Sequence, residues 1–344
     1  MAKKYINMGD YNEESEVKKK KRMTLNPFEN MFSKDGKGIE KDELKVLDKP
    51  GFANFFKLFR RRLNHIFSVN ILLILGNFPL LFTLFALAYT TEDVLAPSTQ
   101  IYPLLQGSAL FDNSPAVMTL IGIFGKQDSV TVLSTASYVF FALTLLVLFT
   151  FGLVNVGTTY ILRNIIKGEP VFIMSDFWYA IRRNWKQGLV FGIIDVALIA
   201  ILAYDITYYQ ANLGVSNLFL LMYVLGYGMA IIYGFVRMYA YPIMITFDMK
   251  LWKILKNSIY FAILGIKRNI MALIGAFIVV ALDLILIKVF LPIGIVIPFI
   301  ILFGFLQYMS VYAAYPKIKE IMIDPYYKEI ENSTEPEEEP SEAV

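Results

Sequence analysis

The chain has 344 residues, of which 56% are hydrophobic and only 18% charged, a composition typical of proteins with membrane segments. Cysteine is absent and His65 is the single histidine, which excludes thiol catalysis, cysteine-ligated zinc or iron–sulfur sites and multi-histidine metal centres. We therefore expect neither a metal nor a cofactor. The net charge of +3 combines a basic N-terminal end with an acidic C-terminal end.

Both ends of the chain are predicted to be disordered tails. Residues 1–50 are rich in Lys and include "KKKKR" at 18–22, while residues 324–344 contain "ENSTEPEEEPSEAV", and such charged segments bury too little apolar surface to fold. The first fifty residues lack the apolar core of a signal peptide, so we expect the N-terminus to stay in the cytoplasm. Beside a membrane domain, the basic tail is better explained by anionic lipid at the cytoplasmic face than by nucleic acid.

Residues 51–323 are predicted to form an all-α membrane domain with six transmembrane helices. A bilayer core requires about 20 apolar residues in helical form. Six windows qualify: 66–90, 134–160, 188–208, 217–245, 270–290 and 295–315. The segment 91–133 is left as an outer loop. Its apolar run "PAVMTLIGIFG" at 115–125 is too short to span, and whether it re-enters the membrane stays open.

The distribution of Lys and Arg predicts the orientation. The 161–187 and 247–269 loops each carry five basic residues, whereas the 91–133 loop carries one and the 209–216 loop has no charge. Because Lys and Arg accumulate in short cytoplasmic loops, we expect the first two loops inside and the other two outside. Six spans then leave both termini in the cytoplasm.

Three amphipathic segments precede inward-starting spans. In "SDFWYAIRRNWKQG" at 175–188, Phe177, Ile181 and Trp185 recur every four residues, and the basic side chains take the other side of the helix. This pattern is typical of a helix lying in the membrane interface. Two further segments share this pattern, and each of the three ends in a basic cluster and an Asn. The predicted interfacial residues are Phe55, Phe59 and Arg61, then Phe177, Arg182, Arg183 and Trp185, then Trp252 and Lys256; the predicted hinges are Asn64, Asn184 and Asn269. The segments are either three repeated units of interfacial helix and membrane hairpin or three independent basic loops.

Charged residues inside the spans form a candidate intramembrane polar site. Charges in a bilayer are costly, so each one is a functional hypothesis. Asp195 and Arg237 should lie at similar depth on neighbouring antiparallel helices, either as a structural pair or as part of a substrate or ion path. Asp283 is a candidate for a polar cavity, because Lys288, five residues later, does not share its helix face.

Several motifs resemble those of a known family. "VNILLILGNFPL" at 69–80, "DFWYAIRRNWKQG" at 176–188 and "YPIMITFDMKLWKILKNSIYFAI" at 241–263 are similar to recurring signatures of the YesL-like family, bacterial integral membrane proteins with a domain of unknown function. The resemblance implies a multi-pass protein of the bacterial cytoplasmic membrane, often encoded beside carbohydrate ABC-transporter genes. Subunits of an ABC sugar importer are therefore expected partners, together with the lipid bilayer.

Three functions are compatible with these features. We expect a non-enzymatic membrane protein that assists or regulates solute uptake, with carbohydrate as the expected solute. The first alternative is a transporter or permease subunit with a polar intramembrane path. The second is a lipid-facing membrane enzyme, although the sequence lacks the H-E-x-x-H, P-loop and G-x-S-x-G signatures.

Overall fold

The computed structural model describes residues 50–88, 91–97, 99–111, 114–125 and 127–327. All of them belong to one compact unit, Lys41–Val344. The predicted N-terminal tail lies outside the described residues except for its last position, and the predicted C-terminal tail lies outside them from residue 328 onward.

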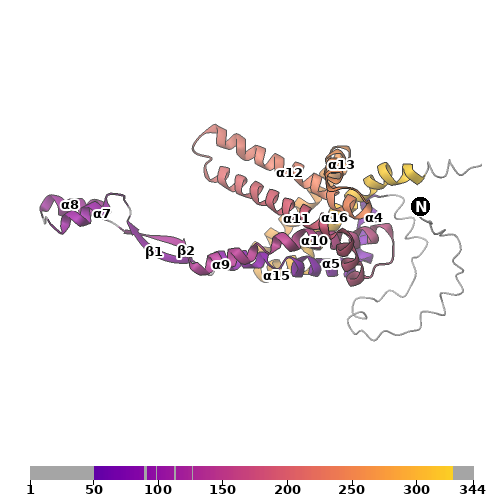
Figure 1. Ribbon diagram of the computed structural model, residues 1–344, viewed down its shortest axis with the longest axis horizontal. Coiled ribbons are helices and arrows are strands. Elements are labelled where there is room, and N and C mark those ends of the chain that lie inside the picture. Colours follow the sequence, from indigo (N-terminus) through magenta and orange to yellow (C-terminus); the bar gives the residue numbers. More distant parts are fainter. Residues whose placement is uncertain (1–49, 89–90, 98, 112–113, 126, 328–344) are drawn as a thin grey trace, which may run out of the picture. The chain divides into compact units, whose positions relative to one another are not determined.

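Helices form most of the described chain (Figure 1). The N-terminal part contains α4 (Phe52–Arg61), α5 (Leu63–Gly76) and α6 (Leu80–Ala88), then β1 (Thr91–Pro97), α7 (Tyr102–Ala109), α8 (Pro115–Phe124) and β2 (Gln127–Leu133). The rest contains α9 (Thr135–Thr144), α10 (Val147–Lys167), α11 (Ile173–Ala211), α12 (Asn217–Thr246), α13 (Leu251–Leu264), α14 (Ile266–Val289), α15 (Leu291–Ile297), the π-helix η1 (Pro298–Leu302), α16 (Phe303–Ile318) and the π-helix η2 (Lys319–Ile323).

The protein is a multi-pass membrane protein by helix length and hydropathy. Five helical segments are long and apolar enough to cross a bilayer: Thr135–Lys167, Ile173–Ala211, Asn217–Thr246, Ile266–Val289 and Leu291–Tyr327. The pair α5 and α6, bent by 60°, makes a sixth if it is counted as one span. The bend falls where Pro79 cannot donate a backbone hydrogen bond, and the Asn77 side chain donates to the Leu73 carbonyl at 2.8 Å. The structure thus confirms the predicted helical domain with five or six apolar helices that could cross a membrane.

The predicted outer loop contains regular structure that the all-α expectation omitted. β1 and β2 pair antiparallel, from Thr91 opposite Leu133 to Pro97 opposite Gln127. The apolar run at 115–125 supplies α8, whose N-cap Ser114 accepts a hydrogen bond from the Val117 backbone at 3.4 Å. Strand-forming Val and Thr residues in "QDSVTVL" at 127–133 explain the ribbon.

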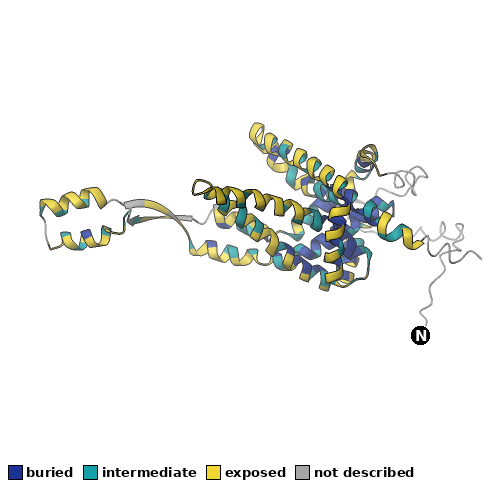
Figure 2. Ribbon diagram, turned by 90° about the horizontal axis from the view of Figure 1, so that it is seen from above, coloured by how far each residue is buried: buried dark blue, intermediate teal, exposed yellow. Residues whose placement is uncertain are grey.

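Close packing of α10 on α11 organises the bundle. A Cβ atom on Gly152 would lie 2.5 Å from the Cα of Gly192 and would also collide with the Gly188 carbonyl oxygen. Gly188 and Gly192 are four residues apart on α11, and small residues at this spacing let membrane helices approach closely. Buried residues gather in one part of the bundle (Figure 2), where Ile161 and Leu162 of α10 pack in one cluster with Tyr308 of α16.

Three helices are interrupted by residues with nearly the same backbone conformation. Arg62 separates α4 from α5 with φ −109° and ψ 22°, Asn184 interrupts α11 with φ −116° and ψ 19°, and Gly265 separates α13 from α14 with φ −92° and ψ 11°. These values lie in the sparsely allowed bridge region. One non-helical residue therefore lies between α4 and α5, between the two parts of α11, and between α13 and α14.

Candidate functional sites

A buried polar cluster joins α11 to α12 and α10. The Asp195 carboxylate is fully buried and accepts hydrogen bonds from Nε of Arg237 at 2.9 and 3.0 Å. It also accepts the hydroxyl groups of Tyr233 and Tyr241, each at 2.6 Å. The Arg237 guanidinium donates further to Oδ1 of Asn155 at 3.2 Å. Asp195 and Arg237 therefore form the ion pair that was one of the two interpretations from the sequence.

The helix repeat explains why these donors converge on one carboxylate. Tyr233, Arg237 and Tyr241 recur every four residues, so their side chains lie on one face of α12. The Arg237 guanidinium also lies over the rings of Phe151 and Tyr241, with its central carbon 5.3 and 5.5 Å from the ring centroids. The hydrogen bonds of Asp195 to α12 and the hydrogen bond of Arg237 to Asn155 therefore link α10, α11 and α12.

Asp283 lies apart from this cluster. Its side chain is buried on α14, and its Oδ1 atom has no hydrogen-bond partner among the described residues. It lines a cavity of about 210 Å³ between α14 and the α15–α16 segment. The structure thus brings together two of the three candidate intramembrane residues and leaves the third in a separate place.

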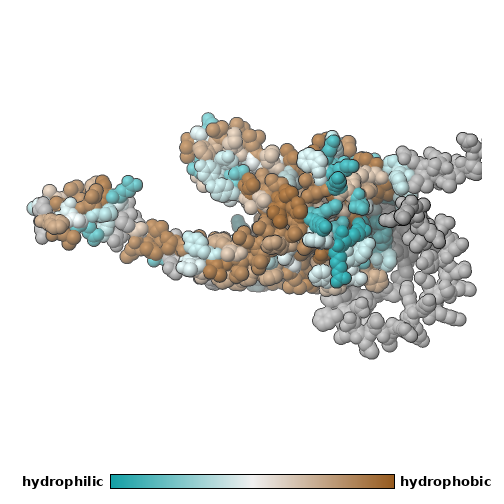
Figure 3. Space-filling model, in the orientation of Figure 1, coloured by the Kyte–Doolittle hydropathy of each residue, from teal (hydrophilic) through white to brown (hydrophobic). Residues whose placement is uncertain are grey.

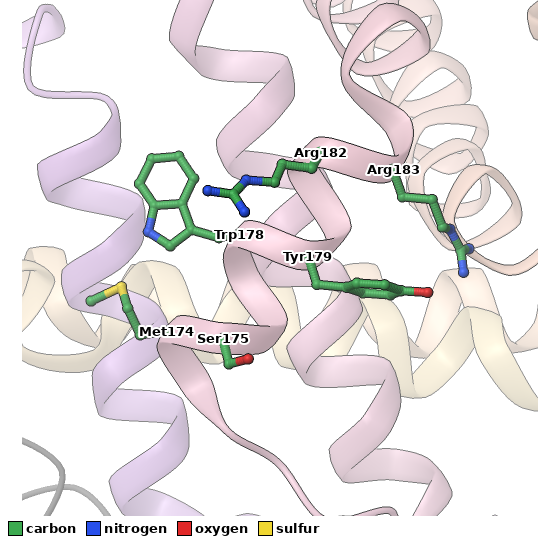
Figure 4. A pocket seen from close by; sticks show the side chains of 6 residues that line it. All are labelled: Met174, Ser175, Trp178, Tyr179, Arg182 and Arg183. Atoms are coloured by element: carbon green, nitrogen blue, oxygen red, sulfur yellow. The ribbon is translucent and has the colours of Figure 1, made fainter.

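The N-terminal half of α11 carries an exposed aromatic–basic surface, which we define by Met174, Ser175, Trp178, Tyr179, Arg182 and Arg183. These residues line an open cavity of about 730 Å³. Figure 4 shows the Trp178 and Arg182 side chains on the same side of the helix, whereas Arg183 points away from them. About half of the Trp178 and Tyr179 side chains is exposed.

Local capping explains where this helix begins. The Asp176 carboxylate accepts a hydrogen bond from the backbone N–H of Phe172 at 2.9 Å, which satisfies a group that helix N-termini leave free. α11 therefore begins at Ile173, earlier than the predicted segment at 175–188. The interfacial segment and the third predicted span are one continuous helix apart from the interruption at Asn184.

Several predicted interfacial side chains pack inside the protein, which corrects their expected exposure. The Phe177 ring would collide with a Cβ atom on Gly157 of α10 and is buried. Phe55 lies 5.0 Å from the Tyr308 ring, and Phe59 lies 4.5 Å from the Phe305 ring, measured between centroids. The aromatic side chains of α4 therefore pack on α16, and that of Phe177 packs on α10, instead of facing lipid.

Other predicted interfacial residues remain on the surface. Trp185 is 51% exposed and Trp252 is 76% exposed. The Lys256 ammonium lies 6.0 Å from the centre of the Tyr260 ring, and Arg61 lies in the last turn of α4. On the face seen in Figure 3, hydrophilic residues gather around α13 and α16, and hydrophobic residues dominate towards α9.

The three predicted hinge asparagines behave differently from one another. Asn184 is itself the interruption of α11, and its side chain donates to the Ala180 carbonyl at 3.0 Å. Asn64 lies two residues after the Arg62 break and is exposed. Asn269 lies four residues after Gly265 and is buried; it donates to the Ala262 carbonyl at 2.9 Å and accepts the Tyr239 hydroxyl at 2.8 Å. It therefore bridges the break rather than forming it.

A buried cation that the sequence did not predict lies at the end of α12. Arg163 of α10 is buried and donates to the Ile245 carbonyl at 3.0 Å and to the Thr246 hydroxyl at 3.4 Å. Arg183 donates to the same Ile245 carbonyl, and Gln187 donates to the Met249 carbonyl at 2.8 Å. Carbonyl groups at a helix C-terminus carry partial negative charge, so Arg163 and Arg183 cap α12. In the sequence, Arg163 was one of the basic residues of the predicted 161–187 loop, and nothing there indicated that it caps α12.

Among the described residues, no group of three or more His, Asp or Glu side chains could hold a metal ion.

Comparison with known protein families gives a match to one part of the chain. The family profile described as "Protein of unknown function, DUF624" matches residues 132–206, and this confirms the resemblance to the YesL-like integral membrane proteins. No curated protein matches the chain. No solved structure matches it either.

Proposed function

We propose that this polytopic protein is a non-enzymatic accessory of solute uptake, on the support of its long apolar helices and of the match of residues 132–206 to the DUF624 family. It acts by offering cytoplasmic aromatic–basic surfaces to subunits of an importer. The expected solute is a carbohydrate, and the support for that choice is the resemblance to the YesL-like family. In this proposal the protein lies in the bacterial cytoplasmic membrane with both termini inside.

The observation that carries the proposal is a contrast between the intramembrane charges and the aromatic residues of α11. The intramembrane charges Asp195 and Arg237 are bound to each other, whereas Trp178 and Trp185 of α11 are each 51% exposed. Exposed aromatic and Arg side chains are the residue types enriched at protein interfaces. Anionic lipid headgroups can also occupy such a surface, and that contact is compatible with presentation of the surface to a membrane-bound partner.

A quantitative pull-down tests the proposal. The tagged full-length protein is extracted in mild detergent from its native membrane, and co-purified proteins are measured for the wild type and for the double substitution Trp178→Ser with Trp185→Ser. We expect importer subunits in near-equal amount with the wild type and a several-fold loss with the variant. Tyr204→Ser is the matched control, because Tyr204 is an exposed aromatic residue on the same helix, 66% accessible.

Either of two outcomes would overturn the proposal: the wild type purifies without importer subunits, or the variant retains them as well as the control does. The transporter alternative is favoured by one observation, the unpaired buried carboxyl of Asp283. Solute flux into vesicles that contain the purified protein alone, abolished by Asp283→Asn, would support that alternative.

A further inference from the structure

A membrane-embedded groove runs between α14 and the α15–α16 segment. On α14 its wall is formed by Val279, Leu282, Asp283 and Leu286, whose spacing of three and four residues places them on one helix face. Ile297, Ile301, Leu302 and Phe305 form the opposite wall, and Phe59 of α4 contributes from a third element. The groove opens at its flank, since Leu282 is 61% exposed.

Among the described residues that line this groove, Asp283 alone is ionisable. Its side chain is 7% exposed, and the buried Oδ1 atom lacks a hydrogen-bond partner within the described chain. Lys288 follows five residues later on α14, so it lies on a different face of the helix, and the described ion pairs do not join the two. The buried carboxylate of Asp195, by contrast, accepts hydrogen bonds from three side chains.

The groove has the size and lining of a receptor for one long basic side chain. Its volume of about 210 Å³ is below the range of about 300 to 1,000 Å³ typical of pockets for drug-sized ligands. Apolar walls with a single carboxyl match a Lys or Arg side chain, which buries its hydrocarbon stem along apolar surface and keeps its charge at the tip. An unpaired carboxyl among apolar side chains is costly, and a cation that donates hydrogen bonds removes that cost.

The geometry points to Asp283 as the docking site for a basic side chain, Lys or Arg, on a membrane helix of a partner protein. α14 can present this site to a helix beside it, because Leu282 and Ile285 on its outward flank are exposed. The inference rests on the proposed function only in that both require a membrane partner. It assigns the contact to the membrane-spanning part, whereas the proposed function uses the aromatic–basic surface of α11.

A designed transmembrane peptide provides the test. Since the chain has no cysteine, Phe290→Cys gives the full-length protein a single donor dye at the end of α14. The protein is placed in phosphatidylcholine bicelles with acceptor-labelled peptides of about 20 Leu and Ala residues, which carry either one central Lys or Leu at the same position. We expect saturable energy transfer with the Lys peptide and only chance transfer with the Leu peptide.

Two variants identify the contact. Asp283→Asn is expected to weaken binding of the Lys peptide about tenfold, the order of effect for a strong polar contact between membrane helices. Asp205→Asn, which removes an acid on α11, is the matched control and should bind normally. If Asp283→Asn fails to fold, Leu286→Trp fills the groove, retains the carboxyl and should block the peptide.

Equal binding of the Lys and Leu peptides, or undiminished binding by folded Asp283→Asn, would overturn the inference. Energy transfer between two copies of the protein that is lost on Lys288→Gln would also overturn it, because a second copy would then occupy the groove. The proposed function can fail independently: a pull-down without importer subunits refutes the accessory role but leaves discrimination between the two peptides unchanged.

Discussion

The Asp195–Arg237 pair permits a double-mutant test of the account of the intramembrane charges. Replacing Asp195 by Leu leaves a guanidinium and two tyrosine hydroxyl groups without their acceptor. Replacing Arg237 by Met leaves a fully buried carboxylate without its cation. Breaking a buried ion pair from one side costs about 3 to 5 kcal/mol. Because the Arg237 side chain is 32% exposed, we expect each single substitution to lower the free energy of unfolding by about 3 kcal/mol.

The double variant separates a structural pair from two independent sites. With both charges replaced by apolar side chains, no charge remains unpaired and the two tyrosine hydroxyl groups alone lose their acceptor. The loss should therefore not exceed that of one single substitution, about 3 kcal/mol, rather than reach the sum of about 6 kcal/mol. The free energy of unfolding is measured by titrating sodium dodecyl sulfate into the protein in mixed micelles and following helix content. Additive losses in the double variant would refute the reasoning, because they would show that the two residues do not stabilise one another.

Three further predictions follow from the packing and the orientation. Gly152→Ala should destabilise the protein by about 3 kcal/mol in the same titration, because its Cβ would meet backbone atoms of α11, whereas Gly228→Ala, with open space around it, should not; equal effects would contradict the close packing. Asn70→Ala should cost about 2 kcal/mol, since it removes hydrogen bonds to two carbonyls at Pro298–Phe299 and from Gly304; an unchanged stability would contradict that role. Ser216→Cys should react with an impermeant maleimide in intact cells and Lys253→Cys only after permeabilisation; the reverse pattern would invert the proposed orientation.

The sequence pattern was sufficient to predict the long apolar helices, but not to predict which side chains of neighbouring helices contact each other. The windows at 188–208 and 217–245 correspond to parts of α11 and α12, because about 20 apolar residues are required to cross a bilayer whatever lies beside them. The pairing of Asp195 with Arg237 followed from their similar expected depth. The two tyrosine donors were visible only as a repeat of four along α12, and their target depends on which face of α11 they meet.

Interactions between distant segments could not be derived from local patterns. "GLVFG" at 188–192 has the spacing of a close-packing motif, but its partner Gly152 is set by the arrangement of α10 and α11. Phe55 and Phe177 were expected to face lipid, since an amphipathic pattern identifies an apolar face without identifying what covers it. The hydrogen bonds of Arg163 could not be predicted from local patterns either, because its acceptors lie 82 and 83 residues away in the chain.

Site-specific photo-crosslinking tests the central claim, that the aromatic–basic surface of α11 contacts an importer subunit. Benzoylphenylalanine replaces Trp178 in the full-length protein, and irradiation is carried out in the native membrane before extraction. The account predicts a covalent adduct with an importer subunit at Trp178 and none at Tyr204, which is also exposed and lies on the far part of the same helix. Crosslinks to lipid alone at Trp178, or the same protein adduct at both positions, would contradict it.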